Sequence, residues 1–328
     1  MAEKVFDLIK RHDSFVITTH ENADPDGIGS EMIFCQIVKS LGKNAQIVNS
    51  TPVPPKYRFL DPENSITSWD ESCERLPKRA ALVILDTSDE YNIGKLKEFL
   101  SRADEIFLID HHEHNEFWPF DGYIDTKASS TCELAVELAI QAGIQLTLTN
   151  AFAAFAGIAY DTGFFAYKKT TARTFKMALS LLESGVIPYK IYSELSENSS
   201  TAALLLEKTV LSTLQILGNG RIAVQVLRAE DLFNCQANLE DSECFVNTPF
   251  KSREIEVSVL IKQNKEKVVR CSLRSKGSIN VAKIALYFGG GGHITAAGFK
   301  SKVGIEETLD LVLTKINEEL DKNDKAGI

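Results

Sequence analysis

The first half of the chain alternates short apolar runs with segments in which apolar residues recur at helical spacing. The predicted strands span residues 14–20, 45–49, 81–86 and 105–110, and the predicted helices span residues 27–41, 94–100, 130–142, 150–160 and 171–184. Ser130 and Glu133 form a capping box at the start of the helix over 130–142. Such alternation is typical of a parallel sheet covered on both faces. The sequence therefore predicts an α/β domain over residues 1–192 with a doubly wound, mostly parallel sheet.

This alternation ends at Gly185, Pro188 and the polar run over 193–200. A long amphipathic helix over 193–212 is expected to connect the first domain to a second one, which takes up residues 213–328. In the second domain, strands are predicted over 221–227, 255–262 and 268–274, and helices over 281–287 and 305–322. We expect a smaller α+β domain, with the active site in a cleft between the two domains.

The composition agrees with two globular domains, because 44% of the 328 residues are hydrophobic and 25% are charged. No run reaches the roughly 18 apolar residues of a membrane span, and the start of the chain is charged where a signal peptide is apolar. We therefore expect a cytoplasmic protein without a membrane partner. The six cysteines form no CxxC pair, which favours reduced thiols over a zinc finger or a disulfide framework.

The net charge of -9 argues against a protein that binds long DNA, since such binding depends on neutralising phosphates with Lys and Arg. The charge is uneven, however, because the segment over 251–283 contains nine basic and three acidic residues. This excess of positive charge indicates either a focused anion-binding site or a solvated strand face, and the sequence leaves both interpretations open.

Candidate catalytic residues stand where the predicted strands end. His20 closes the first strand, Asp86 the third, and Asp110 with His111 the fourth. The carboxyl ends of the strands in an open parallel sheet meet at one edge, where ligands bind. We therefore expect these side chains to come together. Two more carboxylates, Asp24 and Asp26, lie in the loop after His20, and a third, Asp161, follows the apolar helix over 150–160.

A turn with a helix N-cap would explain one of the two Asp residues after the first strand. It would not explain why four separate apolar elements each end at a residue that can bind a metal. Mixed His and Asp ligation favours Mn²⁺, with Fe²⁺, Co²⁺ or Zn²⁺ as alternatives, whereas purely carboxylate sites suit Mg²⁺. Six candidate ligands exceed what one tetrahedral ion needs, so two ions are implied. His12, taken as a surface helix residue, and His114, taken as a loop residue, are left out of the site.

These segments resemble a known family. HENADPDGIGS, LDTSD, DHH and AYDTGFF resemble the four motifs of the DHH phosphoesterases, and SLRSKGSINVAKIALYFGGGGHITAAGF resembles the DHH-associated domain of the oligoribonuclease and pAp phosphatase branch. The first motif departs from the pattern of many relatives, which have Asn-Pro-Asp where this chain has Asn22-Ala23-Asp24-Pro25. The Asp-x-Asp spacing is retained, so the predicted ligands are unaffected.

The resemblance implies a set of roles in the first domain. One Mn²⁺ would be bound by His20, Asp24 and Asp86, and the other by Asp26, Asp86, His111 and Asp161, with Asp86 as the bridge. The catalytic residues it implies are Asp86, His111, His112 and Asp110. Of these, Asp110 would orient an imidazole and His112 would donate to a substrate phosphate. Two such ions would activate a water and neutralise the phosphate oxygens.

The second domain is expected to hold the substrate. Arg274 and Ser275 would bind a phosphate or a base, and the glycine run over 289–292 would expose backbone N–H groups in a flexible turn. His293 would add a side-chain donor. The predicted substrate-binding residues are thus His112, Arg274, Ser275, Gly290, Gly291, Gly292 and His293.

The function expected from these features is Mn²⁺-dependent hydrolysis of short oligoribonucleotides to 5′-nucleoside monophosphates, of pAp to AMP, or of both. The main alternative is a phosphodiesterase that opens c-di-AMP or cleaves pApA. An inorganic pyrophosphatase or exopolyphosphatase and a non-catalytic nucleotide-binding module are further alternatives. A processive exonuclease would need a basic, aromatic-lined channel. The expected partner is a short nucleic acid or nucleotide, and a homodimer is left open.

Overall fold

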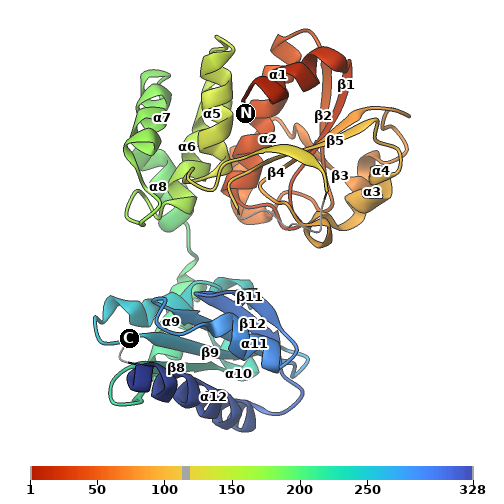
Figure 1. Cartoon of the computed structure of the whole chain (residues 1–328). Coiled ribbons are helices and arrows are strands. Elements are labelled where there is room, and N and C mark those ends of the chain that lie inside the picture. Colours follow the sequence, from red (N-terminus) through yellow and green to blue (C-terminus); the bar gives the residue numbers. More distant parts are fainter. Residues whose placement is uncertain (1, 113–118, 327–328) are drawn as a thin grey trace. The chain divides into compact units, whose positions relative to one another are not determined.

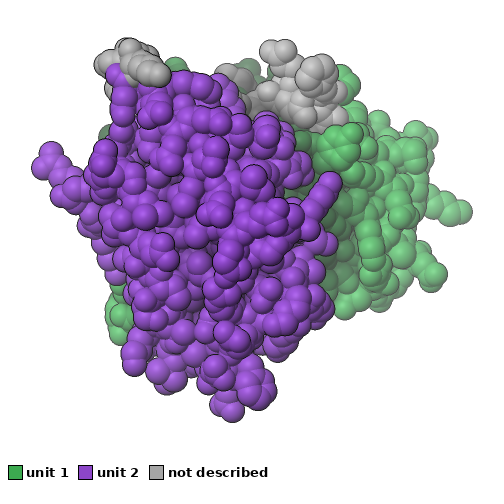
Figure 2. All heavy atoms as spheres, turned by 90° about the horizontal axis from the view of Figure 1, so that it is seen from below, with its two compact units in different colours: residues 1–197 green, residues 198–328 purple. Residues whose placement is uncertain are grey.

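The computed structural model describes residues 2–112 and 119–326 (Figure 1). The chain forms two compact units, Met1–Glu197 and Asn198–Ile328, which Figure 2 draws in green and purple. Each unit has its own sheet and its own hydrophobic core. His114 lies outside the described residues.

The first unit is built on a sheet of six strands within the described residues. These strands are β1 (Ser14–Thr18), β2 (Asn44–Asn49), β3 (Ile66–Ser68), β4 (Ala81–Leu85), β5 (Glu105–Asp110) and β6 (Asp121–Ile124). Their order is β3-β2-β1-β4-β5-β6, and all neighbouring pairs are parallel. This confirms the predicted parallel α/β architecture. The short edge strands β3 and β6 were not predicted, because neither contains an apolar run long enough to be recognised.

Both faces of this sheet are buried, which explains why the central strands are continuous apolar runs. Phe15, Ile17 and Val83 point into one core, which also contains residues of the long helices. Val16 and Ile84 alternate with them and point into a second, smaller core. A parallel sheet covered by helices on both sides therefore follows from the sequence of β1 and β4.

The helices of the first unit are α1 (Ala2–Arg11), α2 (Pro25–Ser40), α3 (Trp69–Ser72), α4 (Lys97–Leu100), α5 (Thr131–Gln141), α6 (Leu148–Asp161), α7 (Ala172–Glu183) and α8 (Pro188–Ser196). Two 3₁₀ segments, η1 (Pro55–Leu60) and η2 (Glu90–Leu96), complete this unit. Residues of α1, α2, α5 and α6 pack in the larger core, and residues of α3, η2 and α4 pack in the smaller one. His12 follows α1 instead of lying in a helix, and its Nε2 is 2.8 Å from Glu105 Oε2.

The strand order reverses direction between β1 and β4, since β2 and β3 extend to one side and β5 and β6 to the other. Loops that follow neighbouring strands diverge at such a point and leave a crevice beyond their carboxyl ends. His20 follows β1 and Asp86 follows β4. The fold thus brings these two residues to the position where α/β sheets bind their ligands.

The prediction of a long helix over 193–212 is wrong. The chain instead forms α8, which ends at Ser196, and a separate helix α9 (Thr201–Ser212). Ser200 caps α9 by accepting a hydrogen bond from the backbone N–H of Ala203 at 3.0 Å. Ser, Asn and Thr compete with helical hydrogen bonds and favour caps, so the polar run over 197–200 separates two helices instead of continuing one.

The second unit contains a mixed sheet with the order β11-β12-β10-β9-β8-β7. Its strands are β7 (Gln215–Leu217), β8 (Ile222–Leu227), β9 (Val257–Gln263), β10 (Val269–Ser275), β11 (Gly291–His293) and β12 (Ala296–Lys300). Only β8 and β9 are parallel among these described strand pairs; the others are antiparallel. The predicted α+β character of this part of the chain is therefore confirmed.

The two faces of the second sheet differ. Leu273 and Val259 lie in a core with residues of α11 (Val281–Tyr287) and α12 (Ile305–Ala326). The opposite face packs in part against α9, α10 (Ala229–Cys235) and the 3₁₀ segment η4 (Phe245–Lys251). A further short 3₁₀ segment is η3 (Glu240–Ser242).

Among the described helices, none has the length and apolar content needed to cross a membrane. The active-site cleft expected between the two domains stays a prediction.

Candidate metal centre

Asp86 lies at the middle of a cluster of carboxylates and imidazoles. It follows β4 with a backbone φ of 62°, in the left-handed region that Asp tolerates better than most residues. Its backbone N–H donates to Ile109 O at 3.0 Å, and its Oδ1 accepts a hydrogen bond of 2.9 Å from Thr131 Oγ1. The side chain is buried, and it is held from two sides before any ligand is considered.

One group of candidate ligands consists of His20, Asp24 and Asp86. His20 Nε2 lies 3.8 Å from Asp24 Oδ1 and 3.6 Å from Asp86 Oδ2. Burial disfavours the charged ring, but the interactions with the two carboxylates outweigh it and raise the pKa of His20 to about 11. The pair of carboxylates thus stabilises a cation, whether this is a proton on the ring or a metal ion beside it.

A second group consists of Asp26, His111 and Asp161. His111 Nε2 lies 3.2 Å from Asp161 Oδ2, 3.8 Å from Asp26 Oδ2 and 3.6 Å from Asp86 Oδ1. Asp86 therefore presents Oδ2 to the first group and Oδ1 to the second. The six residues expected as ligands come together as these two groups, and Asp86 forms a third possible group with His111 and His112.

Asp24 also caps α2, because its Oδ1 accepts from the backbone N–H groups of Asp26 and Gly27 at 2.9 and 3.1 Å. The N-cap interpretation of this loop is thus correct for Asp24. It does not exclude metal binding, since a carboxylate has about four lone-pair directions and the cap uses one oxygen. Burial opposes ionisation of Asp24, but His20 and the two N–H donors outweigh it and lower its pKa.

Asp26 is completely buried at the N-terminus of α5. Its Oδ2 accepts from the backbone N–H of Thr131 at 2.7 Å, and its Oδ1 accepts from that of Cys132 at 2.8 Å. A helix N-terminus favours an anion, because its first N–H groups lack helical partners. Burial and the neighbouring charges of Asp86 and Asp161 nevertheless raise the pKa of Asp26 well above its ordinary value. Its ionised form therefore requires a further positive charge close by.

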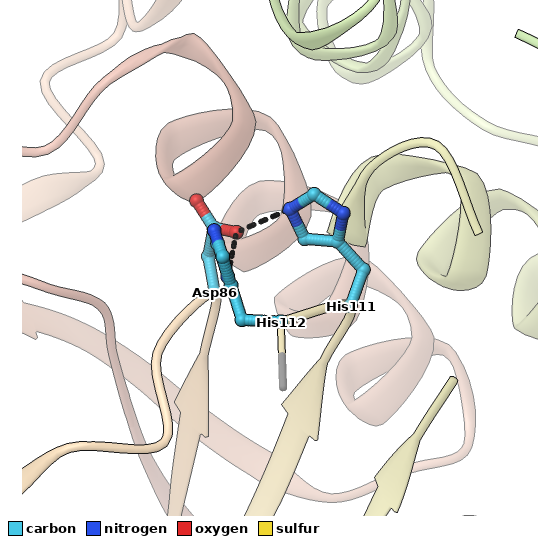
Figure 3. A group of neighbouring side chains, drawn as sticks. All are labelled: Asp86, His111 and His112. Carbon is cyan, nitrogen blue, oxygen red and sulfur yellow. Dashed lines mark ion pairs between the residues drawn. The ribbon is translucent and has the colours of Figure 1, made fainter. Parts of the chain in front are cut away.

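Asp110 acts on His112 and not on His111. Its Oδ1 accepts from His112 Nδ1 at 2.8 Å and from the backbone N–H of His112 at 3.1 Å. Burial opposes both charged groups, but their interaction outweighs it, lowering the pKa of Asp110 and raising that of His112. Figure 3 shows both imidazoles beside the carboxylate of Asp86, and the His112 Nδ1 atom lies 3.8 Å from Asp86 Oδ1. His112 is the more exposed of the two rings.

Two glycines bring the helices of the centre into close contact. A Cβ added to Gly157 would approach the Asp26 Cα atom to 2.9 Å and would also meet Cys132 Sγ. One added to Gly29 would lie 2.6 Å from Ala153 O. Gly27 faces Thr19 after β1, and Gly29 faces α6. Gly29 and Gly157 thus allow the close packing of α2 and α6 that carries Asp161 towards Asp26.

The centre fits divalent cations. His111 Nε2 is buried among three carboxylates without a hydrogen-bond partner in the described residues, and this nitrogen is a metal ligand when it is deprotonated. Two ligand atoms about 2.1 Å from one tetrahedral ion lie roughly 3.4 Å apart. The imidazole and carboxylate atoms of the two groups are separated by 3.2 to 3.8 Å. Small adjustments of the side chains would place an ion in each group.

In the second unit, strand register connects the predicted substrate-binding residues. Arg274 on β10 and His293 on β11 both pair with Ala296 on the strand between them. Residues paired across a sheet point to the same face, so the two side chains share one face, roughly 10 Å apart across two strand spacings. Arg270 lies on this face as well, opposite Lys262. We name Lys262, Arg270, Arg274 and His293 the basic face.

The glycine run is not the flexible turn that was expected. The N–H groups of Gly289 and Gly290 donate to Leu286 O and Ala285 O and so close α11, and Gly291 begins the edge strand β11. The N–H of Gly290 is therefore not available for a phosphate. Ser275 is buried and its Oγ donates to Ile279 O at 2.6 Å, so its hydroxyl hydrogen is already used inside the unit.

Sequence reasoning missed two residues of the centre. Thr131 was assigned to the start of a helix, where the capping box of Ser130 and Glu133 already explained the pattern. The second residue is Lys169, whose Nζ lies 3.5 Å from His111 Nδ1. Lys169 lies between the segment AYDTGFF and α7, where no periodic pattern of residues indicates a role for it.

Comparison with known proteins shows the family to which the chain belongs. The model of the DHH family, N-terminal domain, matches residues 14–159, and the DHHA1 domain model matches residues 220–322. The chain therefore belongs to the DHH family and is a phosphoesterase.

Among its relatives, the bifunctional oligoribonuclease and PAP phosphatase NrnA of Thermus thermophilus is 31% identical over 93% of this chain and 89% of the relative. The cyclic-di-AMP phosphodiesterase PdeA of Listeria monocytogenes is 27% identical over 97% of this chain, which spans 49% of that protein. The crystal structure of an exopolyphosphatase-related protein from Bacteroides fragilis superposes with a TM-score of 0.89 at 24% identity, covering 98% of this chain and 95% of the other. This last likeness concerns the fold.

Proposed function

We propose that the chain is a two-metal, Mn²⁺-dependent phosphoesterase that hydrolyses short oligoribonucleotides to 5′-nucleoside monophosphates and pAp to AMP. The proposal rests on the position of the Asp86 carboxylate between two imidazoles. Its Oδ2 lies 3.6 Å from His20 Nε2 and its Oδ1 lies 3.6 Å from His111 Nε2. A carboxylate shared by two sets of ligands suits a pair of ions, and the imidazoles favour Mn²⁺ over Mg²⁺.

Each residue of the centre has a role in this proposal. His20 and Asp24 hold one ion, Asp26, His111 and Asp161 hold the other, and Asp86 belongs to both. When bound, two divalent ions supply Lewis-acid activation of a water and neutralise phosphate oxygens. Thr131 fixes one oxygen of Asp86 by donating to it. Asp110 orients His112, whose half-exposed ring donates to a substrate phosphate.

The substrate side of the proposal rests on the basic face of the second unit. Arg274 and His293 share that face, and Arg270 pairs with Lys262 on it. Burial and the positive charges of Arg270 and Arg274 lower the pKa of Lys262, against the opposing effect of the nearby Glu243. Four basic or imidazole groups match a substrate with few phosphates. The name of the relative from Thermus thermophilus agrees with such a substrate.

A second candidate function is hydrolysis of a cyclic dinucleotide or of its linear product pApA. It is favoured by the 27% identity to a cyclic-di-AMP phosphodiesterase over 97% of this chain. Both functions use the same centre and the same basic face. Among their substrates, c-di-AMP has no terminal phosphate, whereas pAp and pApA each have at least one.

One substrate panel tests both candidates. The protein, freed of metal with EDTA and then supplied with Mn²⁺, is incubated with pAp, pApA, c-di-AMP, pyrophosphate and RNA of two to ten nucleotides. We expect the fastest release of mononucleotide from the shortest RNAs and from pAp. Preferential turnover of c-di-AMP would support the second candidate instead. Phosphate release from pyrophosphate alone would contradict the assignment of nucleotide substrates.

A further inference from the structure

One cation touches the carboxylate and imidazole centre from outside. Lys169 is an exposed residue whose Nζ lies 3.5 Å from His111 Nδ1, on the side of the ring away from the carboxylates. The centre itself is strongly acidic, because Asp24, Asp26 and Asp86 are joined there by Asp110 and Asp161. Two divalent ions carry four positive charges, and the ion pair of His112 with Asp110 offsets the fifth carboxylate. A phosphodiester would therefore meet a centre without excess positive charge, so a further cation beside it would favour binding.

The loop that carries Lys169 is firmly built. Gly163, Phe164 and Phe165 all have left-handed backbone, with φ values of 54°, 54° and 67°. Bulky residues adopt this conformation only where their surroundings enforce it. Thr162 enforces it here, since its Oγ1 accepts from the Phe165 N–H and its O accepts from the Tyr167 N–H.

Aromatic packing holds the same loop. The ring of Phe165 stacks on Phe175 with centroids 5.2 Å apart and meets Phe155 edge-on at 5.6 Å. Phe164 contacts Tyr192 of α8 with centroids 5.0 Å apart. The backbone of the loop is thus anchored by α6, α7 and α8, and the flexible stem of Lys169 extends from an anchored base.

The contact between Lys169 and His111 cannot coexist with metal binding at the other nitrogen of the ring. A neutral imidazole that gives Nε2 to an ion carries its hydrogen on Nδ1. That N–H cannot accept from an ammonium group, so the two hydrogens would face each other. The ammonium, on its four-carbon stem, is then free to bind an anion beside the centre.

We propose that Lys169 is a substrate-binding residue of the phosphoesterase, whose ammonium pairs with a phosphate oxygen of the nucleotide next to His111. This inference rests on the proposed function and adds a cation from the first unit to those of the basic face. It adds to the centre a second donor from the first unit, beside His112.

The test compares Lys169→Met, Lys169→Arg and Lys168→Met with the wild-type protein. Lys168 is the matched control, because it is an exposed residue with the same charge one position earlier. With Mn²⁺ and pApA, we expect Lys169→Met to raise KM by about 10- to 100-fold, as for the loss of a charge-assisted hydrogen bond. Lys169→Arg should restore KM to within about threefold, because the charge is kept. Lys168→Met should behave as the wild type.

Calorimetric titration with Mn²⁺ separates substrate binding from support of His111. If Lys169 binds phosphate, Lys169→Met should leave the Mn²⁺ affinity unchanged or raise it, because a cation beside a metal ligand is removed. If Lys169 merely supports the ring, the same substitution should lower the Mn²⁺ affinity. Equal KM values for Lys169→Met and Lys168→Met would overturn the inference, and so would a loss of Mn²⁺ affinity in Lys169→Met. In either case, activity of the wild-type protein on nucleotides would still support the proposed function. A wild-type protein inactive on every nucleotide of the panel would overturn both.

Discussion

The metal centre of the first unit and the basic face of the second are built in opposite ways. The centre takes its side chains from the segments that follow β1, β4 and β5 and from α2 and α6, and it buries Asp26 and His111 almost completely. The basic face takes most of its side chains from neighbouring strands of one sheet, and they are exposed or half-buried. The centre is negatively charged and attracts cations, whereas the basic face is positively charged and attracts anions.

This difference indicates which region determines turnover and which determines substrate affinity. Buried carboxylates held by backbone N–H groups and by Thr131 can hardly move, so the geometry of the centre is determined by packing. Long side chains on an exposed sheet face keep more freedom and can suit several nucleotides. We therefore expect substitutions in the centre to affect turnover and those on the basic face to affect substrate affinity.

The largest effect is expected for Asp86→Asn. Because both groups of ligands lose a shared oxygen, kcat should fall by about three orders of magnitude or more, and fewer than two Mn²⁺ ions should bind. The measurements are steady-state kinetics and metal analysis after dialysis. Asp89→Asn is the control, since Asn can still cap η2 as Asp89 does. Full activity of Asp86→Asn with Mn²⁺ would refute the two-metal centre.

A smaller effect of a different kind is expected for Arg274→Met. Removing a charged donor to phosphate should raise KM by roughly 10- to 100-fold and leave kcat within a few-fold. Arg253→Met provides the control, as Arg253 is an exposed residue of the same basic segment. If kcat fell and KM stayed constant, the proposed division of labour between the two regions would be wrong.

The pH dependence of Mn²⁺ binding tests the electrostatics of the centre. The pKa of His20 is raised to about 11, so at neutral pH the ring holds a proton that a metal ion must displace. Mn²⁺ affinity should therefore increase with pH, by about tenfold per pH unit for each proton released. Calorimetry between pH 6 and pH 8 in two buffers of different ionisation enthalpy measures both quantities. A pH-independent affinity would mean that His20 is not a ligand.

The smallest effect is expected for Gly291→Ala. A Cβ at Gly291 would meet nothing within 4 Å and its φ is ordinary, so folding does not require glycine there. If the substrate approaches this strand, the added methyl should raise KM by roughly tenfold, while the melting temperature stays unchanged. Gly304→Ala is matched to it, because Gly304 also has open space and an ordinary φ. Equal KM values for both variants would place the substrate elsewhere.

Much of the centre could be predicted because buried strands cannot end in polar residues without partners. The apolar runs of β1, β4 and β5 stop at or just before His20, Asp86 and Asp110, and each of these residues lies in the centre. Parallel strands then bring distant parts of the sequence to the same edge. The fold class followed from the same alternation.

Other features were not predictable because they depend on contacts between elements. Thr131 reaches Asp86 only because α5 begins beside β4, and a capping box already explained the local sequence. The edge strand β11 and its neighbour β12 escaped prediction because glycine and alanine have little strand propensity. Pairing of β12 with β10 and of β11 with β12 decides their conformation. The role of Lys169 was not predictable for the same reason, since Lys169 lies near His111 only because of the turn at Phe164.

The ligands of the centre are spread along the chain from His20 to Asp161, and this spacing bears on how the enzyme is made. During synthesis, His20, Asp24 and Asp86 leave the ribosome well before the end of α6. The first group of ligands can therefore assemble early, whereas the second must wait until Asp161 has emerged and α6 has packed on α2. A growing chain thus lacks the second group of ligands until nearly all of its first unit has been synthesised.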